Sequence, residues 1–345
     1  MKISYNSERY PDALQGNLMP ARSLQCRPVA SIIMPACNAA AFVGEAISSM
    51  LHQTLDDFEF LIVDDASTDA TVDVIRGFDD SRIRLYCNET RQGVAGSLNI
   101  LLDKVQGDFI ARMDADDISL PHRLETQVAF MRENEDIWIC GGAYAVFVDR
   151  DKPGFVCDLP ATHDEIKAAL LFFNPVAHPF VMYRGDAWRK HAIRYSTASP
   201  HAEDYELWVR LAHKYTEGRM ANLQDVIGKY RRHTASVSAK HTDVQRGAAL
   251  KLQIQLLQGL GFSVFDKGFA AHAAFFAKKQ RVMKIEQVFP IFEWAERLRD
   301  ANRQKKIYDE GVLQRLLFEH LRRVVVESQE FASVAYNLLA QWLVR

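Results

Sequence analysis

Three carboxylates follow one apolar segment of the sequence at a spacing that suits metal binding. A short apolar run at 109–113 is followed by Asp114, Asp116 and Asp117. Because side chains alternate between faces in an extended chain, Asp114 and Asp116 share one face. Neighbouring carboxylates repel unless a cation lies near them, and oxygen ligands suit Mg²⁺ or Mn²⁺, which in turn suit a diphosphate. The alternative is a polar turn before a helix that begins at Pro121, and this segment alone favours neither.

Buried strands and amphipathic helices alternate through the first part of the chain. Strands are predicted at 29–34, 58–63, 82–86 and 109–113, and helices at 40–54, from about 69 to 78, at 93–105 and at 121–134. This alternation is typical of a parallel sheet with right-handed crossovers. We therefore expect the polar segments 35–38, 64–65 and 114–116 to meet at one edge of the sheet, where open α/β sheets bind ligands.

The second part of the chain predicts a looser pattern and then helices. Further strands are predicted at 136–148, 180–183 and 225–230, and helices from Thr162 to Phe173 and from Glu203. From about residue 241 the chain is mostly helical, with one apolar stripe. The stripe comprises Leu313, Leu316, Leu317, Leu321, Val324 and Val325. We interpret it as packing between helices, and an amphipathic contact with a membrane surface is the alternative.

Composition excludes several classes of protein. The formal net charge of −2 over 345 residues gives no basic field, so we expect no nucleic-acid partner. The five cysteines form no CxxC pair, which disfavours structural zinc and a disulfide framework. The first residues contain no apolar segment typical of a signal peptide, and no apolar run reaches membrane-spanning length. The expected location is the cytoplasm, or the inner face of the membrane.

The ordered set of motifs resembles glycosyltransferase family 2, an inverting group with a GT-A fold. The matching segments are 31–38, 48–54, 58–69, 88–99, 107–117, 178–179, 203–208 and 230–233. One departure is Cys37, where the family usually carries an aromatic residue. The resemblance implies a mixed, Rossmann-like α/β sheet flanked by helices, with a C-terminal helical extension. The implied domains are an arm at 1–27, a GT-A domain at 28–240 and a helical region at 241–345.

Within the GT-A domain, the resemblance implies a donor-nucleotide half at 28–135 and an acceptor half at 136–240. By position, Asp65 resembles the residue that hydrogen-bonds the uracil of a UDP-sugar, and Pro35 and Asn38 line the same pocket. Asp114 resembles the residue at the ribose and the metal, and Asp116 the direct ligand of Mn²⁺ or Mg²⁺.

The acceptor half contains further matching positions. Asp204 resembles the catalytic base, which takes the proton of the acceptor hydroxyl as the new bond forms. His233 matches a position that completes metal or diphosphate binding, and Arg231 and Arg232 could hold phosphate. Ordinary structural roles stay open: Asp204 as an acidic residue in a first helical turn, Asp65 as a helix cap, and His233 as a structural histidine.

The resulting hypothesis is an inverting transfer of a sugar from a nucleotide-sugar to a saccharide or lipid-linked acceptor. A Rossmann dehydrogenase is disfavoured because the turn at 35–38 contains no glycine. A sugar nucleotidyltransferase would need a Gly-rich, basic loop after the first strand, which is absent. A protein that binds a nucleotide-sugar as a scaffold without turnover would be expected to lack some of these carboxylates. An oligomer, and a peripheral membrane contact through the C-terminal helices, are left open.

Overall fold

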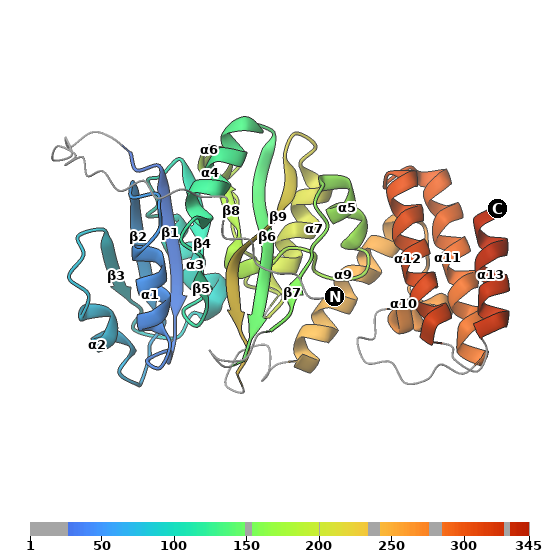
Figure 1. The fold of residues 1–345 in the computed structure, drawn as a ribbon, viewed down its shortest axis with the longest axis horizontal. Coiled ribbons are helices and arrows are strands. Elements are labelled where there is room, and N and C mark those ends of the chain that lie inside the picture. The colour runs from blue at the N-terminus through green and yellow to red at the C-terminus, as the bar shows by residue number, and fades with distance from the viewer. Residues whose placement is uncertain are drawn as a thin grey trace, which may run out of the picture.

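A computed structural model describes residues 27–148, 154–199, 201–233, 242–275, 285–327 and 332–344. One mixed sheet with helices on both faces is followed by a group of helices at the far end of the molecule from β3 (Figure 1). Apart from Arg27, the predicted N-terminal arm lies outside the described residues, as does the predicted boundary near residue 241.

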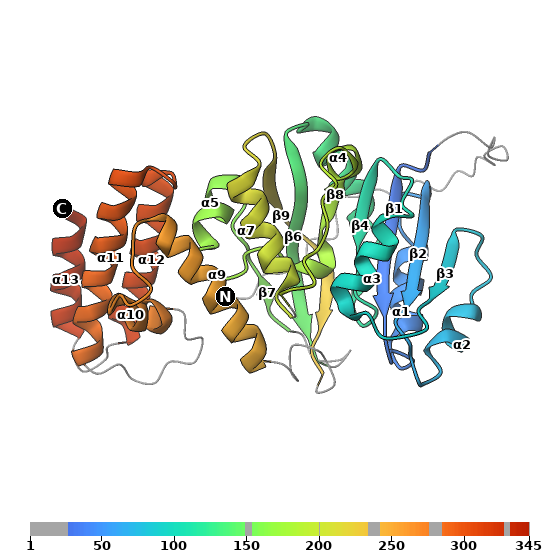
Figure 2. The same cartoon turned by 180° about the vertical axis from the view of Figure 1, so that it is seen from behind.

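The predicted parallel part of the sheet is confirmed. Its strands are β1 (Ala30–Ala36), β2 (Phe58–Asp64), β3 (Ile83–Cys87) and β4 (Phe109–Arg112), in the order β3-β2-β1-β4. Helix α1 (Val43–Leu51) covers the face seen in Figure 1. Helix α3 (Gly93–Leu102) covers the opposite face, seen in Figure 2, and the short α2 (Thr71–Arg76) lies beside α1. The carboxyl ends of these strands therefore meet at one edge, as the alternation predicted.

Pro35 does not stop β1, as the sequence suggested, but lies within it opposite Val63. Proline has no N–H to donate, and at this position of β1 an N–H would point toward the side of β4. Ile33 faces β4, because its carbonyl accepts the Met113 N–H at 3.1 Å, and Pro35, two residues on, faces the same side. Strand β4 has ended by then, so the strand loses no ladder hydrogen bond at the proline.

The other half of the sheet is antiparallel at its junction with the first. Strand β8 (Met182–Arg184) pairs antiparallel with both β4 and β6 (Ile137–Phe147), and β9 (Arg219–Arg231) runs parallel to β6. The two-residue strands β5 (Ile118–Ser119) and β7 (Val156–Cys157), too short to show a pattern, were not predicted. Strand β9 begins before the predicted residue 225. The polar Asn222 lies in this earlier part of the strand, where it is buried and its side-chain amide donates to two carbonyls.

Five short helical segments complete this domain: α4 (Arg123–Glu133), α5 (His163–Ala169), a 3₁₀ turn (His178–Phe180), α6 (Gly185–Lys190) and α7 (Glu203–Lys214). The predicted cap of α5 is confirmed, because the Thr162 hydroxyl accepts the Glu165 N–H and Glu165 accepts the Thr162 N–H. Helix α5 ends at Ala169, and turns continue to Phe173, where the sequence predicted one longer helix. Helix α6 was not predicted.

The C-terminal region consists of α9 (Thr242–Gly259), α10 (Gly268–Phe275), α11 (Ile285–Lys305), α12 (Glu310–Glu327) and α13 (Ala332–Val344). The apolar stripe of α12 is buried, with Leu317 and Leu321 fully inaccessible, so the packing interpretation is confirmed for it. The region also bonds to the turns after α5, since Gln253 donates to the Phe172 carbonyl at 2.7 Å. One hydrophobic core runs from the sheet into these helices. Among the described residues, no helix is both long and apolar enough to cross a membrane.

Candidate active site

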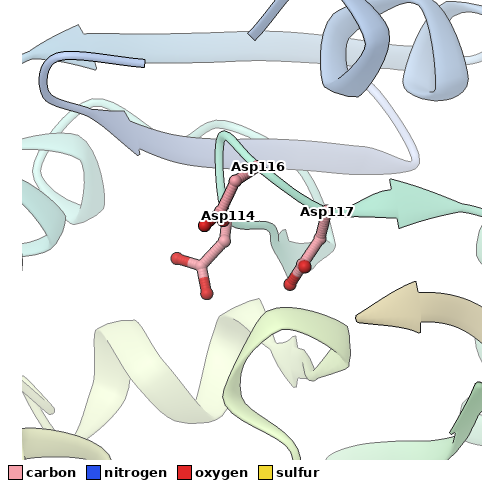
Figure 3. Close-up of side chains that lie close together, drawn as sticks. All are labelled: Asp114, Asp116 and Asp117. Atoms are coloured by element: carbon pink, nitrogen blue, oxygen red, sulfur yellow. The ribbon is translucent and has the colours of Figure 1, made fainter. Parts of the chain in front are cut away.

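The turn between β4 and β5 carries the three carboxylates that the sequence singled out. One oxygen from each of Asp114, Asp116 and Asp117 lies within 4.8 Å of the others. Figure 3 shows all three side chains leaving this turn, with the carboxylates of Asp114 and Asp117 directed into the space beneath it. A cluster of this kind binds a hard divalent cation when its charge is not neutralised by the protein alone.

His233 reaches the same cluster from the end of β9. Its Nε2 lies 2.8 Å from Oδ2 of Asp116, and its ring packs against Phe42 with 4.6 Å between centroids. The structure therefore brings together the three side chains predicted as metal ligands, Asp114, Asp116 and His233.

Arg231 fastens β9 to the acidic turn. Its backbone N–H donates to Oδ1 of Asp117 and its Nε donates to the Asp116 carbonyl, each at 2.8 Å. Its Nη2 forms an ion pair with Glu45 of α1 at 2.5 Å. The Nε and Nη2 groups of Arg231 are therefore engaged within the protein, whereas the side chain of Arg232 is exposed just beyond the strand.

Arg112 is a member of the site that the sequence reasoning missed. Its side chain is buried, and its Nη2 forms an ion pair with Oδ1 of Asp114 at 2.5 Å. Burial raises the pKa of Asp114, against the opposing effect of Arg112, and the Asp116 charge adds to the rise. Burial first, and then the charge of Asp116, also raise the pKa of Asp117 well above its usual value. An arginine inside an apolar run was the available signal, because a charge is buried only when it is paired.

The acidic cluster fits a cation by a second observation. Oδ2 of Asp117 is buried and accepts no hydrogen bond from any described residue. A buried carboxylate oxygen without a donor is costly unless a positive charge approaches it. Asp117 is therefore a further candidate ligand, whereas the sequence had counted it in the acidic cluster without assigning it to the metal.

Asp204 lies in the first turn of α7, across the cleft from the acidic turn. Its Oδ2 accepts from Nδ2 of Asn174 at 2.7 Å, and its Oδ1 accepts from the Tyr205 N–H at 2.8 Å. Burial raises the pKa of Asp204, and burial together with the Asp204 charge raises that of Glu203 to about 7. Asn174, in a loop the sequence predicted only as a turn, was not foreseen as a partner.

One cleft of about 300 Å³ contains the groups from both sides. It is lined from the sheet side by Arg112, Asp114 and Asp116 and from the other side by Asn174, His178, Glu203 and Asp204, with Tyr144 and Tyr230 at one wall. The carboxylates of the acidic turn and the carboxylate of Asp204 thus face one cleft. Such an arrangement can bind a cation on one side and accept a proton on the other.

Pro35, Asn38 and Asp65 lie beside this cleft, at the ends of β1 and β2, and not in its lining. Asn38 adopts a φ of 50° and its Oδ1 accepts the Thr68 N–H at 2.8 Å. Asp65 accepts from the Gln92 and Gly93 N–H groups at 2.7 and 2.9 Å and from Asn88 at 2.8 Å. Asp65 therefore holds the start of α3, and its Oδ2 retains one lone pair, because only the Gly93 bond uses that oxygen.

Comparison with known proteins agrees with this architecture. The family model described as "Glycosyl transferase family 2" matches residues 31–173. An uncharacterized glycosyltransferase of Haemophilus influenzae is 31% identical over 236 residues, which are 66% of this chain and 72% of that protein. The Escherichia coli protein WfgD, named UDP-Glc:alpha-D-GlcNAc-diphosphoundecaprenol beta-1,3-glucosyltransferase, is 32% identical over 221 residues, 61% of this chain and 79% of that protein.

Solved structures show the same fold at low sequence identity. TarS of S. aureus (residues 1–349) superposes with a TM-score of 0.52 at 16% identity, covering 89% of this chain and 91% of that one. The mannosyltransferase PcManGT from Pyrobaculum calidifontis, solved with GDP-Man and Mn²⁺, has a TM-score of 0.52 at 15% identity, covering 92% and 87%. The expected GT-A fold is confirmed, and the chain belongs to glycosyltransferase family 2.

Proposed function

We propose that this glycosyltransferase moves a sugar from a UDP-sugar to a hydroxyl of a saccharide or lipid-linked saccharide, with inversion at the anomeric carbon. The observation that carries the proposal is the shared cleft, in which Asp204 faces Asp114 and Asp116. The name of WfgD contains a UDP-sugar donor and a diphosphate-linked lipid acceptor, and TarS has been solved with UDP and with UDP-GlcNAc. These likenesses support the donor class and a role in the synthesis of a bacterial polysaccharide.

Asp114, Asp116 and His233 would hold a Mn²⁺ or Mg²⁺ ion, with Asp117 as a further ligand. A cation bound there would neutralise the charge that develops on the leaving diphosphate. PcManGT, a fold relative, was solved with Mn²⁺ and a nucleotide-sugar, which supports a divalent ion at this position. Arg231 keeps the acidic turn and β9 together, so of the two arginines Arg232 is free to reach a phosphate group.

Asp204 would act as the general base. An acceptor hydroxyl is a poor nucleophile at neutral pH, and a positioned carboxylate removes its proton as the glycosidic bond forms. The Asn174 amide holds one carboxylate oxygen and a backbone N–H holds the other, which fixes the orientation of the group. Direct displacement needs no second carboxylate as nucleophile, so Asp204 can serve as base without a covalent partner.

The nucleoside would bind beside the cleft, at the ends of β1 and β2. The remaining lone pair on Oδ2 of Asp65 can accept the imide N–H of uracil, whereas adenine offers no donor at the equivalent ring nitrogen. Pro35 and Asn38 would flank the base. The proposal includes the location expected from the sequence, which is the cytoplasm or the inner face of the membrane.

The deciding experiment is calorimetric titration of UDP into the protein with Mn²⁺ and then with EDTA. We expect binding that needs the metal and is lost in Asp116→Ala. Asp225→Ala is the matched control, since Asp225 is an exposed aspartate of β9 outside the cleft. Retained binding in Asp116→Ala would refute the metal assignment.

Turnover assays with a panel of UDP-sugars then separate the alternatives. Transfer of the sugar to an added saccharide acceptor, with release of UDP, supports the transferase. Binding of UDP without turnover for any sugar or acceptor would favour a scaffold. Consumption of a nucleoside triphosphate with release of pyrophosphate would identify a sugar nucleotidyltransferase instead.

A further inference from the structure

A buried chain of hydrogen-bonding side chains lies behind the wall of the cleft that carries Asp204. His178, in the 3₁₀ turn, lines the cleft, and its Nε2 lies 2.8 Å from the hydroxyl oxygen of Tyr195. The Tyr195 hydroxyl also forms a short hydrogen bond with the hydroxyl of Tyr183 in β8. All three side chains are buried. A chain of hydrogen bonds therefore connects the wall of the cleft with the sheet.

The direction of these hydrogen bonds follows from counting protons. Burial raises the pKa of both tyrosines, so each hydroxyl keeps its single proton. Among the described residues, the Tyr183 hydroxyl has no partner other than the Tyr195 hydroxyl, so it donates to that oxygen. The Tyr195 hydroxyl then donates its own proton to Nε2 of His178. The reverse order would leave the Tyr183 proton buried without an acceptor, which folded proteins avoid.

His178 is therefore a neutral ring with its proton on Nδ1. Burial, and then the charge of Arg112, hold the pKa of His178 well below its ordinary value, so only one ring nitrogen is protonated. Because Nε2 accepts from Tyr195, the proton is on Nδ1. Nδ1 has no hydrogen-bond partner among the described residues. A residue that lines the cleft thus has an N–H donor that the protein itself does not use.

Two further contacts hold this chain beside Asp204. The Asn99 side chain of α3 donates to the Tyr195 carbonyl at 3.0 Å and accepts the Tyr195 N–H at 2.9 Å. The His178 ring packs edge-on against Trp208, with 6.1 Å between the ring centroids. Trp208 lies one helical turn after Asp204 in α7, so it is on the same side of that helix. The donor on His178 is therefore held next to the proposed general base.

We propose that His178 determines acceptor specificity by donating a hydrogen bond from Nδ1 to a hydroxyl oxygen of the acceptor sugar, and that Tyr195 and Tyr183 are positioning residues that fix its tautomer. A saccharide hydroxyl fits because it both accepts and donates, and this wall of the cleft offers the His178 donor beside the carboxylates of Glu203 and Asp204. A sugar that lacks this hydroxyl would leave the buried donor unpaired, which disfavours it. The inference rests on the proposed function, because it concerns the acceptor of that reaction.

The first test is ¹⁵N NMR of the histidine side chains in the whole protein. The signals that disappear in His178→Asn identify His178, and we expect them to come from a neutral ring protonated on Nδ1. A ring protonated on Nε2 would overturn the proposal. This measurement needs no substrate, so it tests the tautomer whether or not the protein proves to be the proposed transferase.

The second test is the kinetics of transfer from a UDP-sugar to methyl glycosides of common hexoses. His178→Asn places an amide N–H at the position of Nδ1–H, whereas the longer side chain in His178→Gln places it at the position of Nε2. We expect KM for the acceptor to rise about tenfold in His178→Gln and much less in His178→Asn, the usual effect of losing one hydrogen bond. The affinity for UDP should stay unchanged in both variants.

Tyr195→Phe tests the positioning role. It keeps the ring and removes the hydroxyl that holds His178, so KM for the acceptor should rise while the affinity for UDP stays the same. Tyr308→Phe is the matched control, because Tyr308 is also a buried tyrosine but lies outside the cleft. Equal KM values in His178→Asn and His178→Gln, or a loss of UDP affinity in step with the rise in KM, would refute the assignment. UDP titration and turnover of the unchanged protein show separately whether the proposed function holds.

Discussion

His233 and Asp116 are separated by 117 residues in sequence, yet Nε2 of one lies 2.8 Å from Oδ2 of the other. We predict that His233→Ala weakens the Mn²⁺-dependent binding of UDP by about 10- to 100-fold, the usual loss when a group that ligates or orients a metal is removed. Calorimetry at saturating and limiting Mn²⁺ measures this. The control is His122→Ala, because His122 is a half-buried histidine that immediately precedes α4. An unchanged affinity in His233→Ala would make the histidine purely structural.

The catalytic assignment of Asp204 predicts a separation of binding from turnover. Asp204→Asn should retain UDP affinity, because the group faces the acceptor side of the cleft, and should lower kcat by about 10²-fold or more. Steady-state kinetics beside calorimetry provide the measurement. Loss of UDP binding together with turnover would mean that Asp204 supports the fold of the cleft.

The same carboxyl predicts a pH dependence with a definite sign. Burial raises the pKa of Asp204, and a base works only when deprotonated, so activity should fall as pH drops through this raised value. The Asn174 hydrogen bond favours the charged form and opposes the rise. Asn174→Ala should therefore move the acid limb of the kcat profile toward higher pH. A limb that stays in place would remove Asn174 from the role of positioning Asp204.

Arg231 predicts a loss of stability rather than of chemistry alone. Its guanidinium is buried, pairs with Glu45 at 2.5 Å and lies over Phe147 at 4.6 Å from the ring centroid. Arg231→Met should lower the free energy of unfolding by about 3 kcal/mol, because it removes the ion pair with Glu45 and the donor to the Asp116 carbonyl. Urea denaturation measures this, and Glu45→Gln/Arg231→Met should cost less than the two single changes added together.

His272 predicts that acid weakens the contact between the helical region and the sheet domain. Its Nδ1 accepts from Nε1 of Trp294 at 3.0 Å and its Nε2 lies 2.9 Å from the Leu171 carbonyl, so the ring is neutral with the proton on Nε2. Burial lowers the pKa of His272 to about 4. The unfolded chain binds a proton near pH 6.5 and the folded one does not, so stability falls as pH drops from about 6.5 toward 4.

Between pH 7.5 and 5.5 this group alone should remove about 1 kcal/mol of stability. Urea titrations of the unchanged protein and of His272→Gln at the two pH values measure the difference. Glutamine cannot bind the proton, so its stability should depend less on pH, although its absolute stability is lower. An equal pH dependence in both proteins would assign the effect to other groups.

The sequence predicted the parallel half of the sheet well because its strands are continuous apolar runs between clear helices. The antiparallel pairing of β8 with β4 and β6, and the parallel pairing of β9 with β6, were harder to predict, because each joins strands that lie far apart in the sequence. The two-residue strand β7 carries too few residues for any periodic signal.

The residues of the candidate site also divide into those that the sequence could predict and those that it could not. Asp114 and Asp116 could be singled out because they follow the end of a predicted strand, and Asp204 because its segment resembles a family motif. The structure has all three around one cleft. Arg112 and Asn174 could not, because their importance lies in a single contact with another side chain. Such contacts become visible only when the chain is folded.

The attachment of β9 to the acidic turn has a consequence for how this protein can be divided. A fragment ending near residue 135 would keep Asp114 and Asp116 but would lack Arg231 and His233, which complete their surroundings. The parts of the chain before and after residue 135 are therefore not exchangeable modules. A chimera that borrows the second half of a relative to change acceptor choice would have to inherit a β9 end matched to Glu45 and Phe42 of its host.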